Sequence, residues 1–536
     1  MDLIRSAGGL PRPAILKPWV VIALFASLVV ALRLPTFFAS VINWDESLYL
    51  LVADQWLQGH APYTAVFDNK PPGIYVLFVL ALKVFGRSVF AIRVLGCLFV
   101  TATCYLISRI GALASRNGWL AGLLAGAIYA LLMIRNNGPA SNTEVFFPAF
   151  STAAWLLVLS RVASDEPLSR RDCRRMALAG FLLGLGFEIK YVVLFDAAAI
   201  AGIFMLAVRR RPAEERTPGR VAGLLAAMGA GFLLPFLAVT AAFALAHRFP
   251  EYWLGNFTSN RARTVGLSFR WSVTALELWT QLRNEGFYWM ALPLAAVALV
   301  RDKAATAKDR FLVATTAGYF LWLLACMVGV FRSVLYGHYF LHLAGALAVL
   351  GADAAVRFAL PEAPGGAPRV WRPSVAAVAA VLALAGVLTA LAPVRHGASL
   401  VYRRLLRGRP NEEDRPGLIA QYLKSRMDPG DVLYVVDDQP VLYFLVPSQL
   451  PTRYAFPPYL VRRLDLPNIT GVDPLLELRH ILDRKPVYVV KRRSEHDPDY
   501  DEAATGPFFE ALRGALARDY ELETTIREVD LFRLKR

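Results

Sequence analysis

The chain has 536 residues, of which 56% are hydrophobic, and its mean hydropathy is +0.43. Soluble domains contain about 45–50% apolar residues. Apolar runs of about 18–25 residues recur along the chain, and each is long enough to cross a bilayer. These properties exclude an ordinary soluble protein and predict a polytopic α-helical membrane protein.

Lysines and arginines give the chain a net charge of +16. Basic residues of a membrane protein anchor its cytoplasmic loops to anionic lipid and set its orientation. We therefore expect the basic residues to contact membrane lipids and not nucleic acid. Cys97, Cys104 and Cys326 fall inside apolar runs, and none of the four cysteines belongs to a CxxC pair. We therefore expect neither a disulfide framework nor a zinc site of recognised spacing.

The apolar runs predict about eleven membrane-spanning helices. They cover residues 18–38, 89–110, 118–134, 144–161, 176–189, 191–208, 220–246, 286–300, 311–330, 337–357 and 373–393. The N-terminal stretch lacks a small-residue cleavage site, so we expect the first run to be retained as a helix. Segment 73–85 is apolar but too short for an ordinary span, and we expect it to lie at the interface or to be partly re-entrant.

The distribution of basic loops supports this arrangement. If segment 73–85 does not cross, every strongly basic short loop, including 161–175, 209–216 and 301–310, lies on one face, which the positive-inside rule identifies as cytoplasmic. The N-terminus is then cytoplasmic and the C-terminus extracytoplasmic. The outer face receives loop 39–88, the turn 135–144, Lys190, loop 247–285, residues 331–339 and everything after about residue 394.

A polar stretch follows the first apolar run and places Asp45, Glu46, Asp68 and Lys70 at the edge of the hydrocarbon. Ionisable groups at this depth are costly and usually functional. Residues 47–57 predict a short amphipathic helix that lies in the interface. The acidic pair lies in its first turn, where Asp45 either acts as a general base or only caps the helix.

Lys70 and Glu144 each allow two interpretations. Two prolines follow Lys70 and hold it extended at the outer leaflet, where it either binds a lipid phosphate or only extends its charge to the interface. Glu144 opens a later span. It either complements the helix dipole behind a cap from Asn142 or Thr143, or supplies a second carboxylate to the site.

Further polar groups share the outer face. Lys190 lies between two short spans, and Arg332, His338 and Tyr339 cluster at the mouth of another pair. A lone histidine is more often structural. Together, however, these groups form a cationic pocket suited to a phosphate or pyrophosphate leaving group. Their common sidedness follows from the topology and indicates one interfacial site.

Residues 395–536 differ in kind from the apolar residues 1–394, because they are charged and carry turn signals. They predict strands within 431–438, 441–446, 486–493 and 523–534 and helices at 417–427 and 506–520. Strands alternating with helices predict that residues 395–536 form a small extracytoplasmic α/β domain. We expect residues 1–394 to form the transmembrane module and its loop 39–88 to carry juxtamembrane helices. The runs GLLAGAIYA and AGFLLGLG predict close helix packing rather than phosphate loops.

The polar stretch and the helices after it resemble a known family. WDESLY, ADQWLQGHAPY and FDNKPPGIYVLFVLALKVFG, in this order, are similar to the first outer loop of the C-type glycosyltransferases. The similarity is to the bacterial branch related to protein O-mannosyltransferases and to the aminoarabinose and uronosyl transferases that modify lipid A. Arg93, the Lys190 turn and HYFLHLAGAL also fit. One position departs, since His342 stands where many relatives have proline.

The resemblance implies an inverting transfer of one hexose or pentose unit from a polyprenyl-phosphate carrier. The reaction is expected on the extracytoplasmic face of the inner (plasma) membrane. The acceptor is expected to be a lipid, glycan or protein of the cell envelope. The resemblance also implies that Asp45 is the base on the acceptor hydroxyl and that Lys70 binds the donor phosphate. Of the remaining positions, Glu46 and Glu144 would position the acceptor or the sugar. The full set of substrate-binding residues that it implies is Glu46, Tyr49, Lys70, Glu144, Lys190, Arg332, His338 and Tyr339.

The chemistry agrees with these residues. A sugar on a lipid phosphate is already activated, so the enzyme needs a base for the incoming hydroxyl and cations for the departing phosphate. Lysines perform the second task without a metal, and we expect no required cofactor. The main alternative is a transporter or flippase of lipid-linked or charged substrates. It would carry charges at mid-membrane and paired broken helices in two halves, and the sequence shows neither.

Overall fold

The structure of the chain is a computed structural model. It describes residues 16–114, 118–162, 164, 166–209, 211–266, 271–284, 289, 318–328, 336–359, 391, 393–409, 411–461, 468–494 and 501–535. The chain divides into two compact units. The first combines Met1–Pro35, Val94–Ala238 and Arg270–Leu400, and the second combines Thr36–Arg93, Val239–Phe269 and Val401–Arg536.

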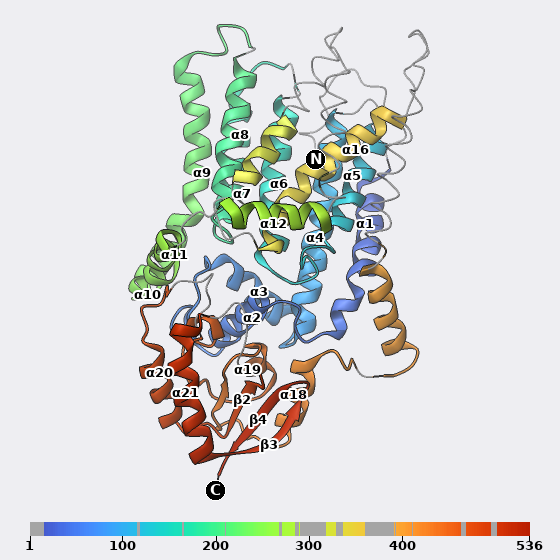
Figure 1. Cartoon of the computed structure of the whole chain (residues 1–536). Helices are drawn as coiled ribbons and strands as arrows, with labels where there is room; N and C mark the ends of the chain where they lie inside the picture. Colours follow the sequence, from blue (N-terminus) through green and yellow to red (C-terminus); the bar gives the residue numbers. More distant parts are fainter. Residues whose placement is uncertain are drawn as a thin grey trace. The chain divides into compact units, whose positions relative to one another are not determined.

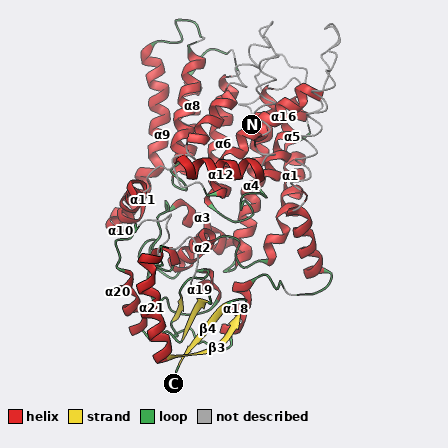
Figure 2. Cartoon of the chain, viewed as in Figure 1, coloured by secondary structure: helices red, strands yellow, loops and turns green. Residues whose placement is uncertain are grey.

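All regular structure described in the first unit is helical (Figure 2). Its helices are α1 (Pro18–Arg33), most of α4 (Val89–Ala114), α5 (Gly118–Leu132), α6 (Thr143–Val162), α7 (Arg170–Phe187), α8 (Val193–Val208), most of α9 (Pro218–Leu245), α12 (Trp271–Asn284), the helix Gly318–Val328, η4 (Gly337–Leu343) and α16 (Ala344–Ala359). Helix α6 packs against α7 and α8, and α5 packs against α1 and α16.

Five described helices are long and apolar enough to cross a membrane. They are Pro18–Phe38, Val89–Leu113, Thr143–Val162, Pro218–Leu245 and Gly337–Val356. Shorter apolar helices occupy other predicted spans, and segment 73–85 forms the separate helix α3 (Gly73–Phe85) with the bounds expected from the sequence. The predicted spans 286–300 and 373–393 lie almost wholly outside the described residues, so the total of eleven stays a prediction.

Small residues bring the helices of the first unit into close contact. A Cβ atom added to Gly122 on α5 would overlap the carbonyl oxygen of Ser108 on α4, and one added to Gly180 on α7 would overlap that of Met228 on α9. Membrane helices use small residues in this way because lipid supplies no hydrophobic force between them. The prediction that the two glycine-containing runs serve helix packing is confirmed.

The second unit contains the described strands together with short helices (Figure 1). Its elements are most of η2 (Leu34–Phe38), α2 (Trp44–Leu57), α3, α10 (Phe249–Trp253), the π-helical turn η3 (Leu254–Thr258), α11 (Ser259–Gly266), α18 (Arg415–Lys424), β1 (Leu433–Val435), α19 (Val441–Leu445), η5 (Pro457–Tyr459), α20 (Pro474–Asp483), β2 (Tyr488–Arg492), α21 (Glu502–Asp519), β3 (Tyr520–Ile526) and β4 (Val529–Leu534).

The four strands form one mixed sheet in the order β1-β2-β4-β3. Strands β1 and β2 are parallel, with Tyr434 opposite Val489, whereas β4 is antiparallel to both of its neighbours. One face of the sheet packs on α20 and α21 through a core that includes Val436, Ile481 and Phe508. The α/β character expected for this part of the chain is therefore present.

Two details of the predicted strands are wrong. Within the predicted strand 441–446, Val441–Leu445 form the short helix α19 and Val446 is its extended C-cap, because a short apolar run carries no periodicity that separates a helix from a strand. The run 523–534 is a hairpin and not one strand. Arg527 and Glu528, both with positive φ, make the two-residue turn between β3 and β4 that a right-twisted hairpin favours.

A helix, α2, forms where residues 47–57 predicted one, but the prediction that it is an amphipathic surface helix is wrong. It begins at Trp44, and residues 46–54 are all buried. The cause is that α2 contacts both α3 and α19. C-terminal residues also bind the loop around it, since the backbone nitrogen of Phe67 donates to the carbonyl oxygen of Arg453 at 2.8 Å. The domain boundary near residue 394 stays a prediction.

We expect Gly180→Ala to destabilise the protein in detergent by about 1–3 kcal/mol, because the added methyl group overpacks the contact between α7 and α9. Gly202→Ala is the matched control, since nothing lies within 4 Å of a Cβ at that helical glycine and alanine favours a helix. Thermal unfolding compares the two variants. Equal melting temperatures would contradict the proposed contact.

Asp437 follows β1 and is fully buried, and burial raises the pKa of its carboxyl to about 6. The folded chain therefore holds this proton more tightly than the unfolded chain does. The free energy of unfolding should fall by up to about 3 kcal/mol as the pH rises from about 4 to about 6. Asp437→Asn should flatten this dependence, measured by thermal unfolding at each pH. The exposed Asp428→Asn is the control, and parallel profiles for wild type and Asp437→Asn would refute the assignment.

Candidate functional site

Asp45 lies in the first turn of α2 but does not cap the helix. The side chain of Asn43 does so, because its Oδ1 accepts a hydrogen bond from the backbone nitrogen of Asp45 at 2.9 Å. The Asp45 side chain is half-buried. The interpretation of Asp45 as an N-cap is therefore wrong, and the interpretation as a base stays a prediction.

Glu46 and Arg93 form a buried ion pair. Two guanidinium nitrogens of Arg93 donate to the two carboxylate oxygens of Glu46 at 2.5 and 2.8 Å, and both side chains are about 1% exposed. The backbone nitrogen of Ile42 also donates to Glu46, and Arg93 reaches the carbonyl oxygen of Thr36. The pair joins the start of α4 to the turn that carries Asp45. The sequence contained a signal for this, because Arg93 lies in an apolar run.

The backbone of Lys70 is held by two tyrosines. The hydroxyls of Tyr63 and Tyr75 donate to its carbonyl oxygen at 2.7 and 3.4 Å. Tyr63 is fully buried and has a φ of 71°, a left-handed conformation that is rare for a large side chain. Its ring packs closely on Gly255, where a Cβ would approach to 2.7 Å. Strain of this kind is concentrated at functional sites.

Asp68 lies beside Lys70 and collects several donors. The hydroxyls of Tyr75 and Tyr459 donate to its two oxygens at 2.7 and 3.2 Å, and the backbone nitrogen of Asn69 donates at 2.7 Å. Burial raises the pKa of the Asp68 carboxyl, while the nearby Lys70 acts to lower it. The contact from Tyr459 ties the C-terminal part of the chain to this loop.

Tyr49 is buried at 1% exposure in the contact between α2 and α3. Its ring meets those of Tyr75 and Phe78 edge to face, at centroid distances of 6.2 and 5.9 Å. The structure therefore brings Asp45, Glu46, Tyr49 and Lys70 into one unit. We call Asp45, Asp68 and Lys70 the loop cluster.

Glu144, Lys190, His338 and Tyr339 form a second group in the first unit, which we call the lysine cluster. The Lys190 ammonium pairs with the Glu144 carboxylate and lies over the Tyr339 ring, 3.7 Å from its centroid. His338 stacks edge to face on Tyr339 at 4.6 Å and lies within electrostatic range of Glu144. Arg332, expected beside them, lies outside the described residues.

Asn142 lies two residues before Glu144 of the lysine cluster, and its sequence position predicts only a helix cap. It directly precedes α6 and is fully buried, yet neither its Oδ1 nor its Nδ2 has a hydrogen-bond partner among the described residues. A buried amide without partners costs free energy unless a ligand or water satisfies it. Thr143 instead donates to Glu144 at 2.9 Å.

The two clusters supply complementary chemistry. The loop cluster offers a half-buried carboxylate and a lysine whose backbone is fixed. The lysine cluster offers a cation held by a carboxylate and an aromatic ring, a combination that suits a phosphate. Among the described residues, one group of three possible metal ligands occurs, and it lies outside both clusters at Asp196, Cys326 and His342.

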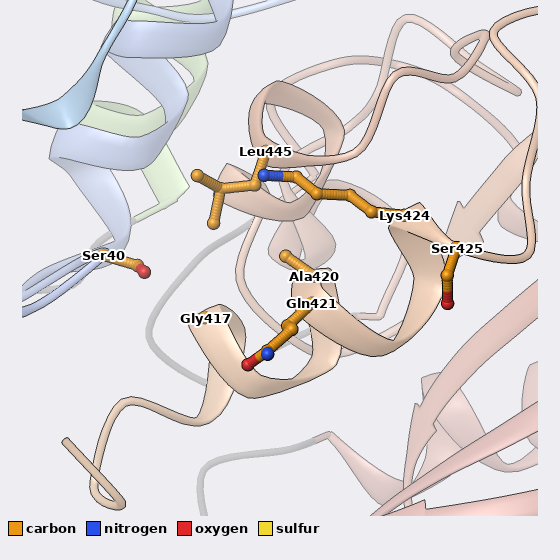
Figure 3. A pocket seen from close by; sticks show the side chains of 7 residues that line it. All are labelled: Ser40, Gly417, Ala420, Gln421, Lys424, Ser425 and Leu445. Carbon is orange, nitrogen blue, oxygen red and sulfur yellow. The ribbon is translucent and has the colours of Figure 1, made fainter. Parts of the chain in front are cut away.

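A surface hollow in the second unit is lined by no residue of the loop cluster or of the lysine cluster. It has a volume of about 480 Å³ and is lined by Ser40, Gly417, Ala420, Gln421, Lys424, Ser425 and Leu445. Figure 3 shows the Lys424 side chain reaching toward Leu445 along one wall. Its lining has one cation and no carboxylate, so the candidate site rests on the ionisable clusters and not on this hollow.

Comparisons relate the chain to membrane glycosyltransferases. Residues 69–237, which include Lys70, Glu144 and Lys190, match the family described as dolichyl-phosphate-mannose-protein mannosyltransferase. The crystal structure of ArnT from Cupriavidus metallidurans bound to undecaprenyl phosphate superposes with a TM-score of 0.57, at 16% identity over 96% of this chain and 97% of that one.

The oligosaccharyltransferase of Archaeoglobus fulgidus has a similar fold. Its structure tethered with an acceptor peptide gives a TM-score of 0.50, at 12% identity over 97% of this chain and 74% of that one. Its apo structure gives 0.51, at 14% identity over 92% and 71%. No curated protein matches the chain. At these identities the superpositions establish the fold.

We expect Glu46→Gln to destabilise the protein by about 3–5 kcal/mol, because it leaves the Arg93 charge buried without its partner. The double variant Glu46→Gln/Arg93→Met should recover most of this loss, since both charges are then gone. Glu251→Gln breaks a largely exposed pair with Arg248 and should cost at most about 1 kcal/mol. Thermal unfolding measures all three. A double variant no more stable than Glu46→Gln would count against the pairing.

Proposed function

We propose that this chain, which shares its fold with the C-type glycosyltransferases, is an integral membrane inverting glycosyltransferase. It transfers a hexosyl or pentosyl unit from a polyprenyl-phosphate donor to a hydroxyl of a lipid, glycan or protein acceptor. The reaction takes place on the extracytoplasmic face of the inner membrane and contributes to a glycan of the cell envelope.

One observation carries this proposal. Asp45 occupies the first turn of α2, where carboxylates usually cap the helix, but Asn43 performs that task. The carboxylate is half-buried in the same unit as Lys70, whose backbone two tyrosines hold. A carboxylate that can act as a base and a cation that can bind a phosphate are the groups that transfer from a lipid phosphate requires.

The proposed reaction uses each group once. Asp45 accepts the proton of the acceptor hydroxyl, and the hydroxyl oxygen attacks the anomeric carbon from the face opposite the phosphate. The bond between that carbon and the phosphate oxygen breaks, and the lipid phosphate leaves with the electron pair. Lys70 stabilises the negative charge that develops on it. The configuration at the anomeric carbon is inverted because the transfer is a single displacement.

The other residues take supporting roles. Glu46 positions Asp45 through its pairing with Arg93. Glu144 holds Lys190 over the Tyr339 ring, and we propose that this lysine and His338 form a phosphate-binding group of the first unit. Lysines neutralise a phosphate without a metal, and we propose no cofactor for the transfer itself.

The comparisons support the substrate classes. The ArnT structure is described as bound to undecaprenyl phosphate, and the archaeal oligosaccharyltransferase as tethered to an acceptor peptide. Because both share the fold of this chain, we propose a polyprenyl-phosphate sugar as donor. The matched family, by its description, uses a dolichyl-phosphate sugar and a protein acceptor.

Asp45→Asn should lower transfer by at least about 10²-fold, since asparagine cannot accept the hydroxyl proton. Asn43→Ala should instead cost about 1 kcal/mol of stability and leave most activity. The measurement is transfer in membranes supplied with radiolabelled polyprenyl-phosphate sugars, with thermal unfolding of each purified variant.

The opposite pattern would overturn the mechanism. If folded Asp45→Asn transfers sugar as well as wild type, Asp45 is not the base. If wild type consumes no polyprenyl-phosphate sugar at all, the transporter or flippase becomes the better explanation of these charges.

A further inference from the structure

Three buried side chains that the proposed transfer does not use meet inside the first unit. They are Asp196 on α8, Cys326 on the helix Gly318–Val328 and His342 on η4. One ligand atom from each lies within 4.8 Å of the others. Asp196 and Cys326 are fully buried, and His342 is 6% exposed. Ionisable groups inside membrane helices are costly and generally mark a function.

Two of the three side chains are already oriented. The Trp155 indole donates to Oδ1 of Asp196 at 2.9 Å, and Nε2 of His342 lies 2.9 Å from Oδ2 of the same carboxylate. The imidazole also packs edge to face on Phe147 at 4.9 Å. Neighbours that fix a carboxylate and an imidazole in this way are typical of metal sites, where they set the direction of the ligands.

His342 is not fully satisfied by these contacts. Its Nδ1 is buried and has no hydrogen-bond partner among the described residues. A buried hydrogen-bonding atom left without a partner destabilises the fold. The hydrogen bond between Asp196 and His342 does not involve the Cys326 sulfur, although this sulfur lies within 4.8 Å of a ligand atom of each.

We propose that Asp196, Cys326 and His342 bind a divalent transition-metal ion, with Zn²⁺ as the best match. Thiolate, imidazole and carboxylate are the three ligand types that zinc takes in proteins. Binding forms one bond to sulfur, one to nitrogen and one to oxygen, and the thiol proton leaves to solvent. The thiolate and carboxylate then cancel the charge of the ion, so the buried site carries no net charge.

Such an ion would be structural and would act on the lysine cluster. It would link three elements that are far apart in the sequence, one of which is η4. That segment also carries His338 and Tyr339, so a metal at His342 would fix the position of both. The proposal does not depend on the proposed transfer, because its test reads metal content directly.

The test measures zinc in the purified full-length chain, stripped with a chelator and then reloaded with Zn²⁺. Wild type should bind about one ion per chain, and Cys326→Ser or His342→Ala should bind it at least about tenfold more weakly. Cys104→Ser is the matched control, because Cys104 is also fully buried in the first unit but is not part of the group. Loading with Co²⁺ should give a thiolate-to-cobalt charge-transfer band that Cys326→Ser removes.

A further measurement uses wild type alone and does not depend on how a variant folds. Zn²⁺ added to stripped wild type should raise its melting temperature in a concentration-dependent way. Uptake of neither ion by stripped wild type would overturn the proposal. So would full zinc stoichiometry and an unchanged cobalt band in folded Cys326→Ser, since the exposed Cys173 would then account for the binding.

Discussion

The buried pair of Glu46 and Arg93 is the constraint on which the geometry around Asp45 depends. Glu46 accepts from Arg93 and from the backbone nitrogen of Ile42, so it closes the turn immediately before α2. Asn43 then caps the helix with a neutral amide. This division of tasks matters because a carboxylate that accepts backbone hydrogen bonds becomes a weaker base. The Asn43 side chain makes the cap, so the cap does not require the Asp45 carboxylate.

The same principle applies to Lys70, whose position depends on hydroxyl groups from elsewhere in the second unit. Tyr63 and Tyr75 hold its carbonyl oxygen, and Tyr459 from the C-terminal part of the chain binds the adjacent Asp68. The C-terminal residues therefore do more than follow the membrane helices. They complete the hydrogen bonds of the loop cluster and cover α2 through α19. Burial of α2, which its sequence pattern did not predict, is a consequence of this cover.

The sequence was sufficient wherever one local pattern determined the outcome. Hydrophobic run lengths predicted α3 and most long helices, and the glycine runs predicted helix contacts. Partners distant in the sequence were not predictable in the same way. Nothing local pairs Glu46 with Arg93 or Lys190 with Glu144, and the left-handed backbone of Tyr63 arises from packing against Gly255. The short apolar run 441–446 was predicted wrongly because its pattern does not separate a helix from a strand, and residues 441–445 form a helix that contacts α2.

Some buried charges of both units are neutralised in pairs, such as Glu46 with Arg93 and Glu144 with Lys190, and His342 is a further buried group that needs a partner. A histidine at a buried position needs a polar partner. Asp196 supplies one, and Trp155 satisfies the second oxygen of that carboxylate. This pair leaves the Nδ1 atom of His342 without a hydrogen-bond partner among the described residues and does not involve Cys326. The unpartnered Nδ1 of His342 and the nearby sulfur together favour a third member with positive charge, which is the physical case for an ion at this point.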